Sequence, residues 1–117
     1  MAFKFENLQV WQKAMDFNDL VFKLSREFPS DERFNLTSQI RRAADSISLN
    51  IAEGSTSQSN PEFARFLGYA TRSLVEVICA LFIAKRRDYL SEELFQEAYS
   101  RGEELVKMIQ GLKNHLK

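Results

Sequence analysis

The sequence predicts an all-α fold, an antiparallel up-down-up-down four-helix bundle in which residues 1–117 form a single domain. Two observations carry this prediction. In four long segments, apolar residues recur at alternating steps of three and four, which keeps their side chains on one face of an α-helix. Helix breakers are scarce, with four glycines and two prolines, and the connections are short enough to place neighbouring helices antiparallel.

The first predicted helix covers about residues 7–28, because Pro29 and Ser30 stop the pattern. Its main face consists of Val10, Ala14, Phe17, Val21, Leu24 and Phe28. The second predicted helix covers about residues 31–53 and repeats the same steps. Gly54 is expected to end this helix, since glycine readily takes the left-handed conformation that follows many helix C-termini.

The third predicted helix covers about residues 60–87 and follows a polar loop with the sequence "GSTSQSN". Two residues are possible N-caps of this third helix. Asn60 could cap the helix with Pro61 in the first helical position, or Ser59 could cap it with Glu62 completing a capping box.

The fourth predicted helix covers about residues 91–116, with Ser91 as its cap. Glu92 and Glu93 favour this start because they complement the positive end of the helix dipole. No segment has the alternation of a β-strand. Four helices of similar length therefore account for the whole chain.

Apolar side chains also lie outside the main faces of the first and third helices. They include Leu8, Trp11, Met15, Phe22 and Phe66. Two explanations are open. These side chains either widen the surface that faces the core, or they form an interface between subunits, because large exposed apolar patches mark association sites.

Charge and composition narrow the classes of function. Sixteen basic and sixteen acidic side chains give zero formal net charge, which argues against a dedicated nucleic-acid binder but leaves room for a local basic patch. Cys79 is the only cysteine, so no intramolecular disulfide can form. The N-terminus lacks a signal-peptide pattern, and Glu76 interrupts the most apolar window. We expect a cytoplasmic protein that does not contact membranes.

The sequence offers no catalytic constellation. The only histidine is His115, and with a single cysteine it provides too few ligands for a zinc site and no partner for a histidine-based triad. No phosphate-binding glycine loop is present. We expect a protein that is not an enzyme and that needs no metal or cofactor.

A polar stripe runs along the second predicted helix. Its members, spaced by three or four residues, are Gln39, Arg42, Ser46, Asn50 and Glu53. The third helix offers Ser73 and Glu76 as partners. The stripe is either a buried polar network that fixes the register of the helices or a surface that contacts a ligand or RNA.

The segment "LTSQIRRAADSISLNIAEG" resembles the signature of the bacterial 23S rRNA-intervening-sequence proteins, and "FENLQVWQKAMDF" and "EFARFLGYATRSLVEV" support the resemblance. The resemblance implies a small four-helix bundle that assembles as a homopentamer and has no established enzymatic activity. It also implies a relation to the accessory proteins of diversity-generating retroelements, in which a basic pentamer binds nucleic acid.

From these features we expect an oligomer of this chain that binds RNA or a ribonucleoprotein. The candidate contacts are Arg41, Arg65, Arg72, Lys85, Arg86 and Arg87. The densest cluster of cations is "KRRDY". Its cations have an alternative explanation that involves no RNA, since positive side chains favour the negative end of the dipole at a helix C-terminus. Tyr69 and Tyr89 are the rings available to stack on bases. The alternative function is a protein–protein adaptor, such as an accessory factor of a nucleic-acid-processing protein, without direct nucleic-acid contact.

Overall fold

The structure is a computed structural model that describes residues 2–117, and it confirms the predicted four-helix bundle. The α-helices are α1 (Gln9–Ser25), α2 (Leu36–Ser55), α3 (Asn60–Arg86) and α4 (Glu92–His115). Two short 3-10 helices, η1 (Lys4–Asn7) and η2 (Ser30–Glu32), precede α1 and α2. Residues 2–117 contain no strand.

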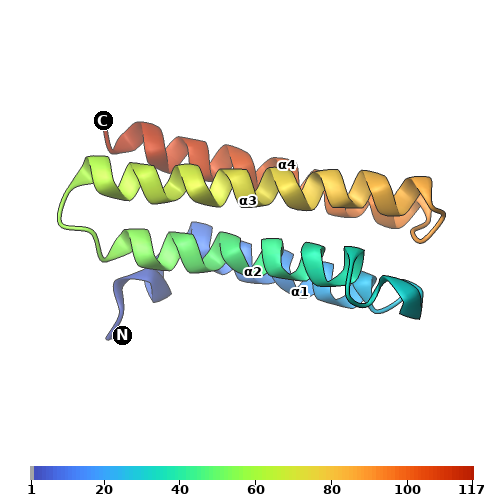
Figure 1. The fold of residues 1–117 in the computed structure, drawn as a ribbon. Coiled ribbons are helices and arrows are strands. Elements are labelled where there is room, and N and C mark those ends of the chain that lie inside the picture. The colour runs from blue at the N-terminus through green and yellow to red at the C-terminus, as the bar shows by residue number, and fades with distance from the viewer. Residues whose placement is uncertain (1) are drawn as a thin grey trace.

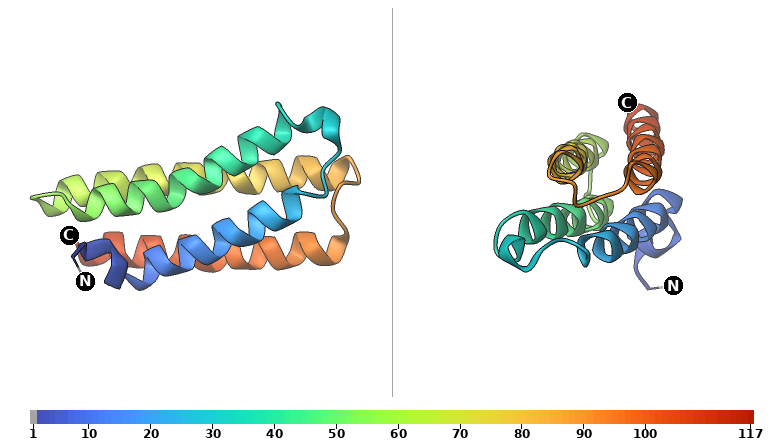
Figure 2. Two further views of the ribbon diagram at one scale, coloured as in Figure 1. Left: turned by 90° about the horizontal axis from the view of Figure 1, so that it is seen from below. Right: turned by 90° about the vertical axis from the view of Figure 1, so that its right-hand side faces the viewer.

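The helices form an elongated square bundle of 44 × 23 × 23 Å. Each helix contacts its two neighbours around the square: α1 packs on α2 and α4, and α3 packs on the same two helices. Figure 1 shows both chain ends and the α2–α3 loop at one end of the bundle, and the other two loops at the opposite end. The end-on view in Figure 2 shows the α1–α2 pair facing the α3–α4 pair.

The core contains the residues that the spacing predicts. All six residues of the first main face are buried, and Ile40, Ile47, Leu67 and Leu81 are fully inaccessible to solvent. α3 is long and apolar enough to cross a membrane by length and composition alone, a criterion that the core helix of a soluble protein also meets. Here only one face of α3, from Phe63 through Leu74 to Ala84, belongs to the core, whereas Val75 and Phe82 are exposed.

The predicted helix ends need correction on either side of the first loop. α1 ends at Ser25 rather than residue 28, because the backbone tightens there into turns in which the Phe28 amide donates to the Ser25 carbonyl. α2 begins at Leu36 rather than residue 31, after η2 and a turn. The Glu32 carboxylate accepts the Leu36 amide at 3.4 Å, so a residue four positions earlier satisfies a free amide of the helix.

The predicted role of Gly54 is wrong. Gly54 lies inside α2, and no glycine of the described chain has a positive φ. A Cβ at this position would lie 2.7 Å from Cβ of Phe66 and 2.9 Å from Cδ1 of Phe63. Glycine is therefore required by the close approach of α2 to α3.

Serine residues are the N-caps of the other two helices, α3 and α4. Ser59, not Asn60, caps α3, since its hydroxyl accepts the Glu62 amide at 3.3 Å. Ser91 caps α4 as predicted and accepts the Leu94 amide at 3.1 Å. The left-handed residue after α3 is Asp88, with a φ of 62°.

Candidate nucleic-acid interface

The polar stripe on α2 forms a small network with α3. Ser46 is its centre: its hydroxyl accepts hydrogen bonds from Nδ2 of Asn50 at 3.0 Å and from the Ser73 hydroxyl at 2.9 Å. Asn50 also donates to the Ser46 carbonyl at 2.8 Å. All three residues are half-buried between the two helices. The network links α2 to α3 and gives the side-chain amide nitrogen of Asn50 two acceptors.

Burial, one of the two alternatives for the stripe, is wrong for its charged members: Arg42 and Glu53 are exposed in the single chain. Glu76, the second partner expected on the third helix, is exposed as well. Within residues 2–117, the side chain of Arg42 donates one hydrogen bond, to the Ser38 hydroxyl on its own helix at 3.4 Å. Because these charged side chains are exposed to solvent, they avoid the free-energy cost of burying a charge.

Arg87 is committed to an internal carboxylate rather than free for RNA. Its guanidinium donates to Glu32 at 2.7 Å, and the Tyr89 hydroxyl donates to the same oxygen at 2.7 Å. Glu32 is only 7% exposed and also accepts from Asn35 at 3.0 Å. The hydrogen bond from Tyr89 is the largest cause that lowers the pKa of Glu32, and the same bond raises the pKa of Tyr89.

Two other predicted contacts are also engaged within the chain. Lys85 pairs with Glu92 at 2.7 Å, and this hydrogen bond lowers the pKa of Glu92. Lys85 also lies 4.4 Å from the centre of the Phe95 ring. Arg41 donates to the Ser25 hydroxyl at 2.8 Å and stacks on Phe22. Among the "KRRDY" cations, only Arg86 is exposed and outside the ion pairs of residues 2–117.

The structure brings Arg65 and Arg72 together with a cation that the sequence reasoning missed. An open groove of about 410 Å³ between α3 and α4 is lined by both arginines, by Tyr69 and by Lys113. The rest of its lining is Ala64, Gly68, Thr71 and Gln110. No acidic residue lines this groove, and its three cations take part in no ion pair within residues 2–117.

The antiparallel register of α3 and α4 explains the position of Lys113. Gly102 on α4 lies against Ile78 on α3, and about three helical turns further along, a Cβ on Gly68 would lie 3.6 Å from Nζ of Lys113. Pairing the two predicted helices antiparallel would have placed Lys113 near Gly68. We refer to Arg65, Tyr69, Arg72 and Lys113 as the cationic groove.

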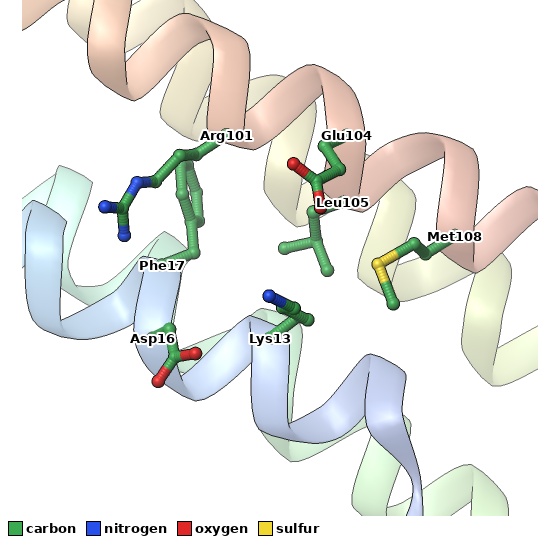
Figure 3. A pocket seen from close by; sticks show the side chains of 7 residues that line it. All are labelled: Lys13, Asp16, Phe17, Arg101, Glu104, Leu105 and Met108. Carbon is green, nitrogen blue, oxygen red and sulfur yellow. The ribbon is translucent and has the colours of Figure 1, made fainter.

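A second, smaller cleft of about 180 Å³ lies between α1 and α4. Figure 3 shows Lys13 of α1 facing Glu104 and Leu105 of α4, with Phe17 beside Arg101. Asp16 also lines the cleft, as does Arg101, which pairs with Glu97. Two positive and two negative side chains balance, so this cleft has no preference for a polyanion such as RNA.

The surplus apolar residues of α1 lie on the outside of the α1–α2 pair. Phe5, Trp11, Met15 and Leu49 line an open groove of about 390 Å³ there. Leu8, Trp11, Met15 and Phe66 are half-buried against their own chain, and the Trp11 ring contacts Phe5 edge-on at 4.8 Å. Phe22 is 44% exposed.

Another apolar groove, of about 270 Å³, lies on the outside of the α3–α4 pair. Its lining includes Val75, Ile78, Tyr99 and Val106, and Val75 is 60% exposed. The chain therefore presents two unlike apolar grooves on opposite sides of the bundle.

Comparisons with known proteins agree with this architecture. The model of the family described as 23S rRNA-intervening sequence protein matches residues 6–111. A crystal structure of a protein of unknown function from the S23 ribosomal protein family of Bacteroides thetaiotaomicron superposes with a TM-score of 0.82. The two sequences are 24% identical, over 89% of this chain and 97% of the other, so this likeness shows the fold alone. No curated protein matches the chain.

Proposed function

The chain belongs to the 23S rRNA-intervening sequence protein family, and from that membership we propose that it is a non-enzymatic, oligomeric four-helix bundle protein that binds RNA in the cytoplasm. The family model covers all four helices except the last residues of α4. RNA is the partner, and the protein contributes binding rather than chemistry.

The observation that carries this proposal is the cationic groove. In a chain with zero formal net charge, three cations line one groove, and none of the described residues that line it is acidic. Phosphate groups of a nucleic acid are the complementary ligand for such a surface, because cations that meet phosphates release condensed counterions. Paired cations, such as Lys85 and Arg87, lack this capacity until their internal partners are displaced.

Oligomerisation is the second part of the proposal. A closed ring needs two different complementary surfaces on each protomer, since its contacts are head-to-tail. The two apolar grooves, one on the α1–α2 side and one on the α3–α4 side, supply such a pair of surfaces. The family resemblance implies that the ring has five protomers. Repetition around a ring multiplies a weak contact into useful affinity.

A salt series tests RNA binding directly. In a gel at about 50 mM salt, the wild-type protein should retard the migration of unstructured RNA. This retardation should disappear near 150 mM salt, because each protomer contacts few phosphates. Binding should depend little on sequence, since phosphate contacts do not read bases. The absence of any retardation at about 50 mM salt would overturn RNA binding and favour the adaptor function.

A further inference from the structure

We infer that the cationic groove is a subsite for one unpaired nucleotide of single-stranded RNA, in which Tyr69 stacks on the base while Arg65, Arg72 and Lys113 hold the neighbouring phosphates. This inference rests on the proposed RNA binding and specifies where and in which form the RNA is held. The rest follows from the placement of these four side chains.

The α3 part of the groove is a single stripe of side chains. Arg65, Tyr69 and Arg72 are separated by four and three residues, so they project from one face of α3, with Tyr69 between the two arginines along the helix. Lys113 approaches from α4 over Gly68, the one position of this stretch that has no side chain. The result is an aromatic ring with a cation on each side along α3 and another across the groove.

The Tyr69 ring is partly exposed and is also held by a neighbouring aromatic ring. It is 41% exposed, and Phe66 packs against it edge-on at a centroid distance of 5.7 Å. Phe66 itself lies close to Gly54 of α2, so its position is fixed by the helix packing. A ring that is already oriented loses little conformational freedom when a base stacks on it.

The other tyrosines are occupied. Tyr89 is half-buried and donates its hydroxyl to Glu32. Tyr99 packs against Phe82 and Phe95, with the Phe95 ring stacked at 5.9 Å. Tyr69 is therefore the tyrosine whose ring is exposed beside unpaired cations.

This chemistry selects an unpaired strand. Bases in a duplex are stacked on one another, so an isolated ring on a protein surface reaches only a base that is already free. A basic groove with an aromatic platform is the usual arrangement of proteins that bind single strands with little sequence preference. The groove volume of about 410 Å³ lies within the range of about 300–1,000 Å³ found for small-ligand sites, enough for one nucleotide.

The test uses the full-length assembled protein and fluorescence anisotropy. The probes are an unstructured RNA of about ten nucleotides and a duplex of the same length, both at about 50 mM salt, where few-phosphate binding is retained. Wild type should bind the single strand more tightly. Tyr69→Ala should weaken single-strand binding at least about 5-fold, the loss expected for one stacked base, whereas Tyr69→Phe should bind as wild type.

Charge substitutions are matched to a control on another face. Lys113→Gln should lower the slope of log K against log salt by about 0.7, the value for one lost phosphate contact with a single strand. Lys23→Gln removes an exposed lysine of α1 that makes no ion pair within residues 2–117, and it should leave the slope unchanged.

The outcomes separate this inference from the proposed function. If wild type binds RNA but neither Tyr69→Ala nor Lys113→Gln changes affinity, the groove assignment is overturned and RNA binding stands. If only Lys113→Gln weakens binding, or if the duplex binds as well as the single strand, the inference that Tyr69 stacks on an unpaired base is overturned. If wild type binds neither probe, the proposed function itself fails.

Discussion

Glu32 joins two loops that are far apart in the sequence. Its carboxylate accepts hydrogen bonds from Asn35 and Leu36 at the start of α2, and from Arg87 and Tyr89 in the connection after α3. These two loops lie at the same end of the bundle (Figure 1). The carboxylate therefore connects the α1–α2 loop to the α3–α4 loop at that end of the bundle.

Glu32→Gln should lower the thermal unfolding midpoint at neutral pH, because the neutral amide is a weaker acceptor for Arg87 and Tyr89. In wild type, the pKa of Glu32 is lowered, so its contribution is complete above the ordinary carboxyl pKa and is lost as pH falls through the lower, folded-state value. Melting curves between about pH 7 and pH 3 should show this loss in wild type and less of it in the variant.

Glu27→Gln provides the matched control for Glu32→Gln, since Glu27 is exposed and in no ion pair of the described chain. It should melt like wild type at neutral pH. Equal melting midpoints for Glu32→Gln and wild type at every pH would show that Glu32 does not stabilise the fold.

At the scale of elements, α2 and α3 make the most extensive contact of any two helices in the described chain, and Gly54 allows a close approach there. Gly54→Ala should destabilise the protein by about 1–3 kcal/mol, because its Cβ would lie 2.7 Å from Cβ of Phe66 and 2.9 Å from Cδ1 of Phe63. Both neighbours are attached to α3, so relief requires the helices to separate. Chemical denaturation would measure the change.

Gly111→Ala is the control for this close approach. Gly111 lies inside α4, and apart from its chain neighbours and the backbone of its own helix, no described atom lies within 4 Å of an added Cβ. Alanine there should stabilise the protein by about 0.5–1 kcal/mol through helix propensity alone. The account of Gly54 is contradicted if both substitutions stabilise the protein.

The spacing of apolar residues predicted the helices correctly because the residues that recur at three- and four-residue steps are the ones that the fold buries. The main face of α1, from Val10 to Leu24, is buried residue for residue, and both serine caps of α3 and α4 follow local chemistry. The end of the first helix was wrong because the apolar spacing continues to Phe28 although the backbone tightens into turns after Ser25. The role of Gly54 was wrong because it depends on the contact between α2 and α3. A glycine within a helix and a glycine after it look the same in one sequence.

The candidate site was less predictable for the same reason. Whether a cation is free depends on which carboxylate lies beside it, and Glu32 and Arg87 are 55 positions apart in the chain. The six cations were therefore indistinguishable until the fold paired Lys85 and Arg87. Lys113 was missed because it lies on α4, outside the segments that resemble the family signature.

At the scale of the whole molecule, each apolar groove should be needed for assembly. Leu49, which is 59% exposed, and Val75, which is 60% exposed, lie in opposite grooves and contribute little to the core of their own chain. Leu49→Glu and Val75→Glu should each dissociate the oligomer, since an unpaired charge buried at an interface costs several kcal/mol. Light scattering would give the mass of each variant.

Gln39→Glu adds the same charge at an exposed position of α2 outside both apolar grooves, so it should leave the mass unchanged. A circular dichroism spectrum like that of wild type would show that the bundle of each variant is folded. Retention of the wild-type mass by Leu49→Glu and Val75→Glu would contradict the use of these grooves in a ring.

Native mass spectrometry of the wild-type protein with a short unstructured RNA tests the central claim, a neutral chain that binds RNA as a ring. At about 50 mM ammonium acetate, where contacts with few phosphates persist, the account predicts an assembly of five 13.6 kDa chains that carries more than one RNA strand. A mass equal to one 13.6 kDa chain, or a pentamer that takes up no RNA, would contradict it.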